Sequence, residues 1–95
     1  MRILIIEDEE RLAETLADIV TQNKDIADVC HDGKSGLNSA LSGIYDAIIL
    51  DVMLPGMNGF DVALELRKAG NTTPVLILTA KTELEDRLRD RKSVV

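Results

Sequence analysis

Aromatic residues are almost absent from this sequence of 95 residues, which has one tyrosine, Tyr45, one phenylalanine, Phe60, and no tryptophan. The core must therefore be aliphatic, and a platform for stacking nucleobases is not expected, because such platforms need exposed aromatic side chains. Positive charge is also scarce, since 11 basic residues stand against 17 acidic ones and the formal net charge is −6. This balance argues against direct nucleic-acid binding by this chain.

Cysteine and long hydrophobic runs are equally rare. Cys30 is the single cysteine, which excludes an intramolecular disulfide and a cysteine metal cluster. Only six residues precede the first acids, too few for a signal peptide. No apolar run approaches the roughly 18 residues of a membrane-spanning helix. We therefore expect a cytoplasmic protein that does not enter the membrane.

Short apolar segments recur along a chain that is long enough for one small domain. Continuous apolar runs, typical of strands covered on both faces, occupy residues 3–6, 47–50 and 75–79. A shorter apolar segment at 26–31 predicts a fourth strand, ending at the turn signal Asp32-Gly33.

Apolar residues at helical spacing fill the intervals between these strands. They predict one helix over residues 9–22 and a second that carries Leu37, Ala40, Leu41 and Ile44. The third helix has Asn58 as its N-cap and Gly70 as its end. Its apolar face is indicated by Phe60, Ala63 and Leu64, with Arg67 at the same spacing and Val62 and Leu66 beside them.

Strand and helix thus alternate, which is the pattern of parallel β/α units with right-handed crossovers. The sequence therefore predicts an α/β fold with an open, doubly wound parallel sheet. The spacing of Thr82 and Glu85 is that of a capping box and predicts the start of a further helix after the fourth strand.

Polar side chains stand where the predicted strands end. Glu7 and Asp8 follow the first strand, Asp51 follows the third, and Thr79 ends the fourth. In open parallel sheets, ligands bind outside the carboxyl ends of the strands, at the point where the strand order reverses. Two unit charges 4 Å apart repel by about 4 kcal/mol at an effective dielectric near 20, so these acids must either take up protons or share a cation. Oxygen ligands favour Mg²⁺.

Asp51 also precedes a loop with an open backbone, which contains Pro55, Gly56 and Gly59. An aspartate beside a metal ion can act as a carboxylate nucleophile. Backbone N–H groups of such a loop can bind the oxyanion that forms on it. The only histidine, His31, is predicted to lie far from the acids, as a surface or strand-edge residue and not a phosphocarrier.

Three segments closely resemble the receiver domain of bacterial two-component response regulators: LIIEDEE, ILDVMLPGMNG and PVLILTAKTELEDR. The likeness runs from residue 1 to about residue 88 and is strongest to receivers that precede a winged-helix DNA-binding domain. It implies a flavodoxin-like fold in which Asp51 accepts a phosphoryl group from a sensor histidine kinase.

The resemblance also implies a role for each site residue. Asp8 and Asp51 would bind Mg²⁺ through their carboxylates, Met53 through its backbone carbonyl, and Glu7 mostly through a metal-bound water. The hydroxyl of Thr79 and the backbone N–H of Ala80 would bind the phosphoryl oxygen, and Thr79 would move with it as the switch.

The sequence departs from the family after the fourth strand. It has no counterpart of the family's last strand and last helix, and it lacks the lysine that precedes a proline. We therefore expect a single truncated receiver domain over residues 1–95, with an atypical tail at 89–95 and no output domain. An apolar fourth strand left at the sheet edge recruits other chains, so we expect a homodimer through residues 75–79 or through exchange of C-terminal segments.

Two alternatives to a phosphoacceptor switch remain open. The first is a truncated, switch-defective receiver that acts as an interaction or dimerisation module. The second is an aspartate-nucleophile phosphatase on a similar sheet, which places a second acid two residues after the nucleophile. Met53 occupies that position here, so no general acid is available and we do not expect an enzyme.

Overall fold

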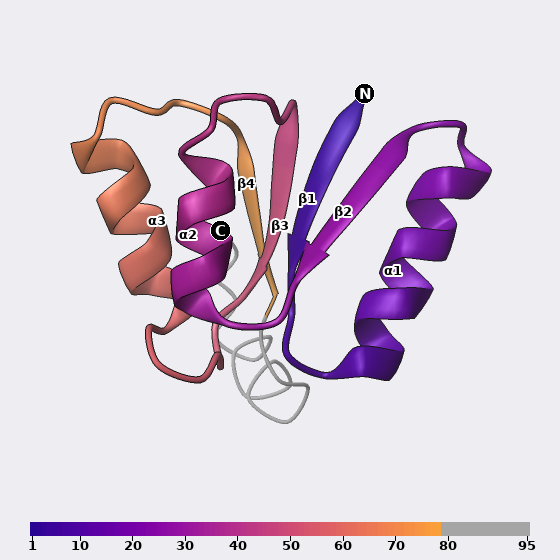
Figure 1. Ribbon diagram of the computed structural model, residues 1–95, viewed down its shortest axis with the longest axis horizontal. Helices are drawn as coiled ribbons and strands as arrows, with labels where there is room; N and C mark the ends of the chain where they lie inside the picture. Colours follow the sequence, from indigo (N-terminus) through magenta and orange to yellow (C-terminus); the bar gives the residue numbers. More distant parts are fainter. Residues whose placement is uncertain (79–95) are drawn as a thin grey trace, which may run out of the picture.

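The computed structural model describes residues 1–78, which form a four-stranded parallel sheet with the strand order β2-β1-β3-β4 (Figure 1). The strands are β1 (Arg2–Ile6), β2 (Ile26–Cys30), β3 (Ala47–Asp51) and β4 (Val75–Leu78). All three neighbouring pairs are parallel. The strand order reverses between β1 and β3, so the predicted ligand site belongs at their carboxyl ends.

Helices cover both faces of the sheet, as predicted for a doubly wound fold. They are α1 (Glu10–Gln22), α2 (Gly33–Ala40) and α3 (Gly59–Lys68). Helix α1 packs on one face, over β1 and β2, whereas α2 and α3 pack against each other on the opposite face (Figure 1). Within residues 1–78, no helix is long and apolar enough to cross a membrane.

Side-chain caps fix where α2 and α3 begin. The Asp32 carboxylate accepts a hydrogen bond from the Ser35 backbone N–H at 2.8 Å, and the Asn58 side chain accepts one from the Asp61 N–H at 3.0 Å. Such caps satisfy backbone donors that have no partner inside the helix. The predicted N-cap Asn58 is therefore confirmed, and Gly70 follows the end of α3 with a φ of +85°.

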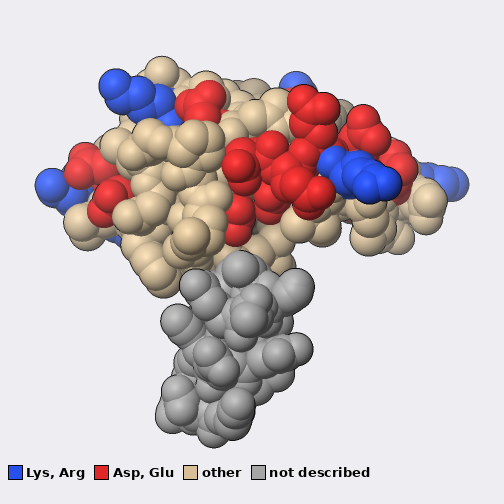
Figure 2. All heavy atoms as spheres, turned by 90° about the horizontal axis from the view of Figure 1, so that it is seen from below, with Lys and Arg blue, Asp and Glu red and all other residues tan. Residues whose placement is uncertain are grey.

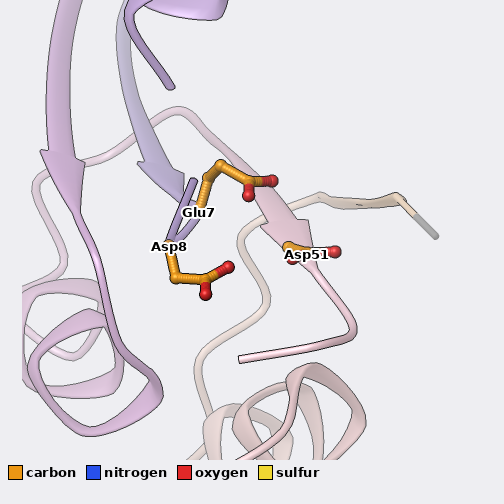
Figure 3. Close-up of side chains that lie close together, drawn as sticks. All are labelled: Glu7, Asp8 and Asp51. Carbon is orange, nitrogen blue, oxygen red and sulfur yellow. The ribbon is translucent and has the colours of Figure 1, made fainter. Parts of the chain in front are cut away.

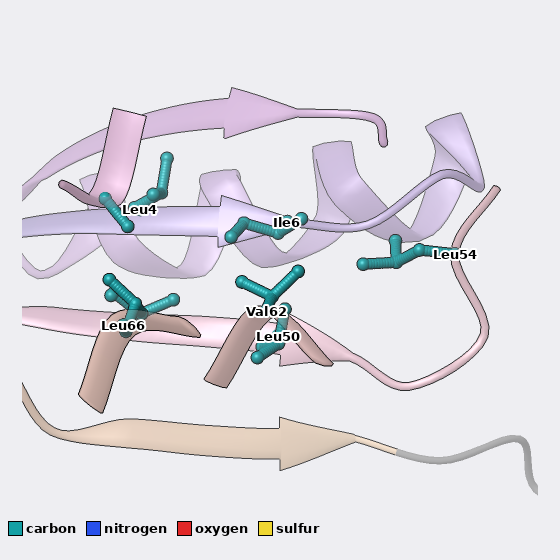
Figure 4. Packing of buried hydrophobic residues seen from close by; sticks show 8 residues of the cluster. Leu4, Ile6, Leu50, Leu54, Val62 and Leu66 are labelled. Carbon is teal, nitrogen blue, oxygen red and sulfur yellow. The ribbon is translucent and has the colours of Figure 1, made fainter. Parts of the chain in front are cut away.

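The core between the sheet and the pair α2 and α3 is aliphatic. Its largest fully buried members come from β1, β3 and α3: Leu4, Ile6, Ile48, Leu50, Val62 and Leu66. Figure 4 shows how side chains of the sheet and of α3 interdigitate across the two layers. Each such side chain contributes roughly 1.5–3 kcal/mol through burial. This packing holds the helices on the sheet, whereas the parallel pairing of β1 with β3 sets the distance between the two strands whose carboxyl ends carry the acids.

Two helix predictions were wrong in detail. Helix α2 ends at Ala40, and Ile44 lies in the following loop with 53% of its surface exposed, because the chain turns at Gly43 with a φ of +80°. In α3 the inner face is formed by Val62 and Leu66, not by Phe60 and Leu64, which are 59% and 56% exposed. Gly59 shares the inner face and lets the backbone approach β3 closely, which sets the rotation of the helix.

Candidate functional site

Three carboxylates meet at the carboxyl edge of the sheet (Figure 3). Glu7 and Asp8 follow β1 directly, and Asp51 is the last residue of β3. Because Ile6 pairs with Leu50, Glu7 lies beside Asp51 in the adjacent strand. One carboxylate oxygen from each of the three residues lies within 4.8 Å of the others. The structure thus brings together acids that are more than 40 positions apart in the chain.

The surroundings of these carboxylates are negative. Figure 2 views this edge of the molecule from below and shows a broad group of Asp and Glu side chains near its centre. Glu9 and Glu10 follow Asp8 directly in the chain. In the described part of the chain, the salt bridges involve other acids, Asp25, Asp28 and Glu65. A cation at the cluster would therefore offset charge that no salt bridge within residues 1–78 neutralises.

Burial raises the free energy of the ionised carboxylates of Glu7 and Asp51. Glu7 is 3% exposed and Asp51 is 9% exposed. Burial raises the pKa of Glu7, and the charges of Asp51 and Asp8 add to the effect, although the Glu9 backbone N–H donates to Glu7 Oε2 at 3.0 Å and opposes it.

Burial likewise raises the pKa of Asp51, and the charge of Asp8 adds to it. Backbone N–H groups of Met53 and Val52 act in the opposite direction. A small divalent cation with oxygen ligands fits this donor set, because carboxylates, a backbone carbonyl and water are what Mg²⁺ takes.

The loop between β3 and α3 borders an open cleft beside the acids. The cleft has a volume of about 450 Å³ and is lined by Asp8, Val52, Met53, Leu54, Pro55, Asn58 and Phe60. Backbone hydrogen bonds between residues two positions apart hold the loop. They run from the Leu54 N–H to the Val52 carbonyl at 3.1 Å and from the Met57 N–H to the Pro55 carbonyl at 3.0 Å. The Gly59 N–H also donates to the Val52 carbonyl at 2.9 Å. The cleft is therefore bordered by Asp8 on one side and by the loop that begins directly after Asp51 on the other.

Other predicted site residues are only partly placed. Met53 lines the cleft and is 57% exposed. Thr79, Ala80 and the predicted helix start at Thr82 lie outside the described residues 1–78.

Two contacts near the site were missed by reading the sequence. Gly33 lies against the β3–α3 loop so closely that a side chain there would overlap the Met57 carbonyl. The prediction that His31 lies far from the acids was wrong, because its Nδ1 is 2.9 Å from the backbone carbonyl oxygen of Glu7. The His31 contact follows from strand order, because β2 is the direct neighbour of β1 and the residues after β2 adjoin those after β1. The Gly33 contact follows from the packing of α2 against α3, because Gly33 begins α2 and Met57 lies in the loop that leads into α3.

The sequence profile of the response regulator receiver domain matches residues 3–92. This chain belongs to the response regulator receiver domain family. The match confirms the resemblance found in the sequence, and the four-stranded parallel sheet with its three helices confirms the flavodoxin-like receiver fold.

Two curated relatives are transcriptional regulators. The chain is 48% identical over 87 residues to the transcriptional regulatory protein CiaR of Streptococcus pneumoniae, a match that covers 92% of this chain and 38% of that protein. It is 40% identical over 89 residues to the transcriptional regulatory protein CusR of Escherichia coli, covering 94% of this chain and 39% of that protein. The chain therefore spans about two fifths of the length of these relatives.

A solved structure gives the same result for the fold. The response regulator protein TrrA of Thermotoga maritima, crystallised in complex with Mg(2+)-BeF, superposes with a TM-score of 0.80 at 33% identity. The superposition covers 92% of this chain and 76% of the TrrA chain.

Proposed function

We propose that this receiver domain accepts a phosphoryl group on Asp51 from a phosphohistidine of a sensor histidine kinase. The observation that carries the proposal is the meeting of Glu7, Asp8 and Asp51 beside an open cleft at the point where strand order reverses. An Asp51 carboxylate oxygen forms a bond to phosphorus while the phosphorus–nitrogen bond of the donor breaks, and its electron pair returns to the imidazole nitrogen.

The residues that would hold Mg²⁺ are those of the acidic edge. Asp8 and Asp51 would bind it through their carboxylates, Met53 through its backbone carbonyl, and Glu7 through a bound water, as the family resemblance implies. When bound, the cation offsets the charge of the carboxylates and of the phosphoryl oxygens. The fit rests on the oxygen-only donor set and on two buried acids without a basic partner in residues 1–78.

Other groups of this chain orient the carboxylates and bind the transferred phosphoryl group. The Glu9 N–H orients the Glu7 carboxylate at 3.0 Å, and the Met53 N–H favours the charged form of Asp51, whereas the Val52 N–H donates to the Leu78 carbonyl at 3.0 Å. The hydroxyl of Thr79 and the N–H of Ala80 bind the transferred phosphoryl group and relay its presence as a conformational switch, an assignment that rests on the family resemblance. We propose that this switch serves transcriptional control, as the names of CiaR and CusR state for those proteins.

A phosphodonor experiment tests the proposal. The protein is incubated with acetyl phosphate and Mg²⁺, and the modified position is mapped by tandem mass spectrometry. We expect one phosphoryl group on Asp51, none in Asp51→Asn, and normal modification in Asp18→Asn, a control on the exposed surface of α1. A folded sample that takes up no phosphoryl group, or takes it up elsewhere, would refute the proposal.

The apolar surface at β4 favours a second candidate function, an interaction module that pairs with a second copy. In the described part of the chain, β4 is an edge strand bonded only to β3. Leu76 is 60% exposed and borders an apolar hollow of about 310 Å³ whose other lining residues include Ile3, Ala47 and Ile49. Exposed apolar edges recruit further strands, so two copies would associate through β4 or exchange their C-terminal segments.

A further inference from the structure

The side chain of His31 makes one directed contact, to the backbone of Glu7. His31 is the first residue after β2, and its Nδ1 lies 2.9 Å from the Glu7 carbonyl oxygen. A carbonyl oxygen can only accept a hydrogen bond, so Nδ1 must carry the hydrogen. The contact thereby assigns the tautomer of the ring, with Nε2 left without a hydrogen in the neutral form.

This contact lies one step beyond the end of the sheet. The Glu7 N–H donates to the Cys30 carbonyl at 2.9 Å, which is the last backbone bond between the β1 and β2 segments. The ring of His31 then bonds the carbonyl of the same residue, Glu7. The main chain is therefore held on both sides of Glu7, at the point where the strand ends and the two acids leave the sheet.

Holding the Glu7 carbonyl also orients Asp8. The peptide bond is planar, so the Glu7 carbonyl oxygen and the nitrogen and Cα of Asp8 lie in one plane. A hydrogen bond to that oxygen therefore restrains the position of the Asp8 Cα, from which the side chain departs, and leaves rotation about the N–Cα bond to set the final direction of the side chain. Asp8 itself is exposed, and none of the side-chain hydrogen bonds found in residues 1–78 holds its carboxylate.

We propose that His31 is a positioning residue for the Mg²⁺ site, because it holds the Glu7–Asp8 peptide in the orientation that brings both carboxylates toward Asp51. The proposal rests on the proposed function of these three acids. The three carboxylates repel one another when no cation is present. They stay close enough to share a cation only if the backbone keeps them from moving apart. A ligand set held in place before binding loses less freedom when the cation enters.

Two substitutions separate the hydrogen bond from the mere presence of a polar side chain. The amide nitrogen of asparagine lies at nearly the same distance from the backbone as Nδ1 of histidine, whereas that of glutamine lies farther out, near the place of Nε2. His31→Asn therefore keeps the donor to Glu7, and His31→Gln removes it. Both variants are polar and uncharged, so a general surface role for His31 would affect them alike.

Mg²⁺ binding to the 95-residue chain is measured by calorimetric titration at pH 8, above the range in which an ordinary imidazole is protonated. We expect His31→Gln to raise the Kd for Mg²⁺ on the order of tenfold and His31→Asn to leave it close to that of the natural sequence. Unchanged binding in His31→Gln, or equal losses in both variants, would overturn this inference alone. Absence of Mg²⁺ binding in the natural sequence would overturn it together with the proposed cation site.

The ring itself gives a readout that needs no variant. Nitrogen and carbon chemical shifts of the imidazole distinguish the two neutral tautomers, and we expect the Nδ1–H form in the folded protein with EDTA present. A predominant Nε2–H form would show that the bond to Glu7 is not made, and the proposal would fail even if the variants did not fold.

Discussion

Gly59, the first residue of α3, lies directly against the backbone carbonyl of Asp51, the last residue of β3. A Cβ atom at position 59 would overlap the Asp51 carbonyl oxygen and would lie 2.8 Å from Cα of Val52. Both obstacles are main-chain atoms, which cannot rotate away as the end of a side chain can. The loop after Asp51 therefore keeps its path only while position 59 has no side chain.

Gly59→Ala should consequently damage the site as well as the fold. We expect it to lower the free energy of unfolding by about 1–3 kcal/mol and to weaken Mg²⁺ binding, because the backbone of Asp51 and Val52 must shift. Gly43→Ala is the matched control, since Gly43 has a φ of +80° and open space around it at the other end of the sheet. That control should lose about 1 kcal/mol through backbone strain and bind Mg²⁺ normally. Denaturant unfolding and calorimetry measure the two effects, and equal Mg²⁺ affinities in both variants would contradict the explanation.

Replacing the charged Asp51 by neutral asparagine should make the protein more stable, by an amount that depends on pH, because burial raises the pKa of Asp51. Because the folded-state pKa lies above the ordinary value of 3.8, the cost of the buried charge is fully present above the raised pKa and disappears as the pH falls toward 3.8. In EDTA, Asp51→Asn should therefore unfold a few degrees above the natural sequence at pH 8, with the difference shrinking as the pH approaches 4. Asp18→Asn, followed in parallel by circular dichroism, controls for the removal of a carboxylate from the exposed surface of α1. A lower melting temperature for Asp51→Asn at pH 8 would be inconsistent with a costly buried charge.

A polar network at the opposite edge of the sheet should stabilise the fold independently of the site. The Tyr45 hydroxyl donates to Asp28 Oδ2 at 2.6 Å, and Arg2 Nε donates to the same oxygen at 3.1 Å. These bonds, that of Tyr45 first, lower the pKa of Asp28. We expect Tyr45→Phe to lower the free energy of unfolding by about 1–2 kcal/mol at pH 7.

The pH dependence of that effect has a defined sign. A carboxyl group with a lowered pKa stabilises the fold above its ordinary value of 3.8, and the contribution is lost as the pH falls through the lower folded-state pKa. The Tyr45→Phe effect should therefore shrink in acid. Urea unfolding of Tyr45→Phe, Asp28→Asn and the double variant completes a thermodynamic cycle. Strict additivity of the two single effects would mean that the bond contributes nothing.

Self-association through β4 can be tested with two leucines that are almost equally exposed. Leu76 on β4 is 60% exposed, and Leu64 on α3 is 56% exposed. We expect the natural sequence to sediment as a dimer at micromolar concentration, Leu76→Lys as a monomer, and Leu64→Lys as a dimer. A monomeric natural sequence would exclude this interface, and dissociation by Leu64→Lys would place the contact elsewhere.

Much of this architecture could be predicted from the sequence, because buried parallel strands need continuous apolar runs. The runs at 47–50 and 75–79 coincide with β3 and β4 as far as the structure describes them. The acids could be grouped because parallel strands present their carboxyl ends at one edge, and a reversal of strand order leaves room there.

Other features depend on contacts that a single sequence does not display. Helical spacing alone placed Ile44 in α2, although Gly43 turns the chain before it. The same spacing could not show that Val62 and Leu66, rather than Phe60 and Leu64, face the sheet, since that choice depends on the close approach of Gly59 to β3. The bond from His31 to Glu7 required both the order β2-β1 and the register of the pair.

The most direct test of the central claim is the rate at which Asp51 is phosphorylated in Asp8→Asn. Asp8 does not itself receive the phosphoryl group, so its removal matters only if acids from β1 and β3 share one cation. With acetyl phosphate and Mg²⁺, we expect the rate of phosphoryl uptake on Asp51 to fall at least about tenfold in Asp8→Asn and to stay unchanged in Asp18→Asn. Phosphorylation of Asp8→Asn at the rate of the natural sequence would show that the two strands do not form a single site.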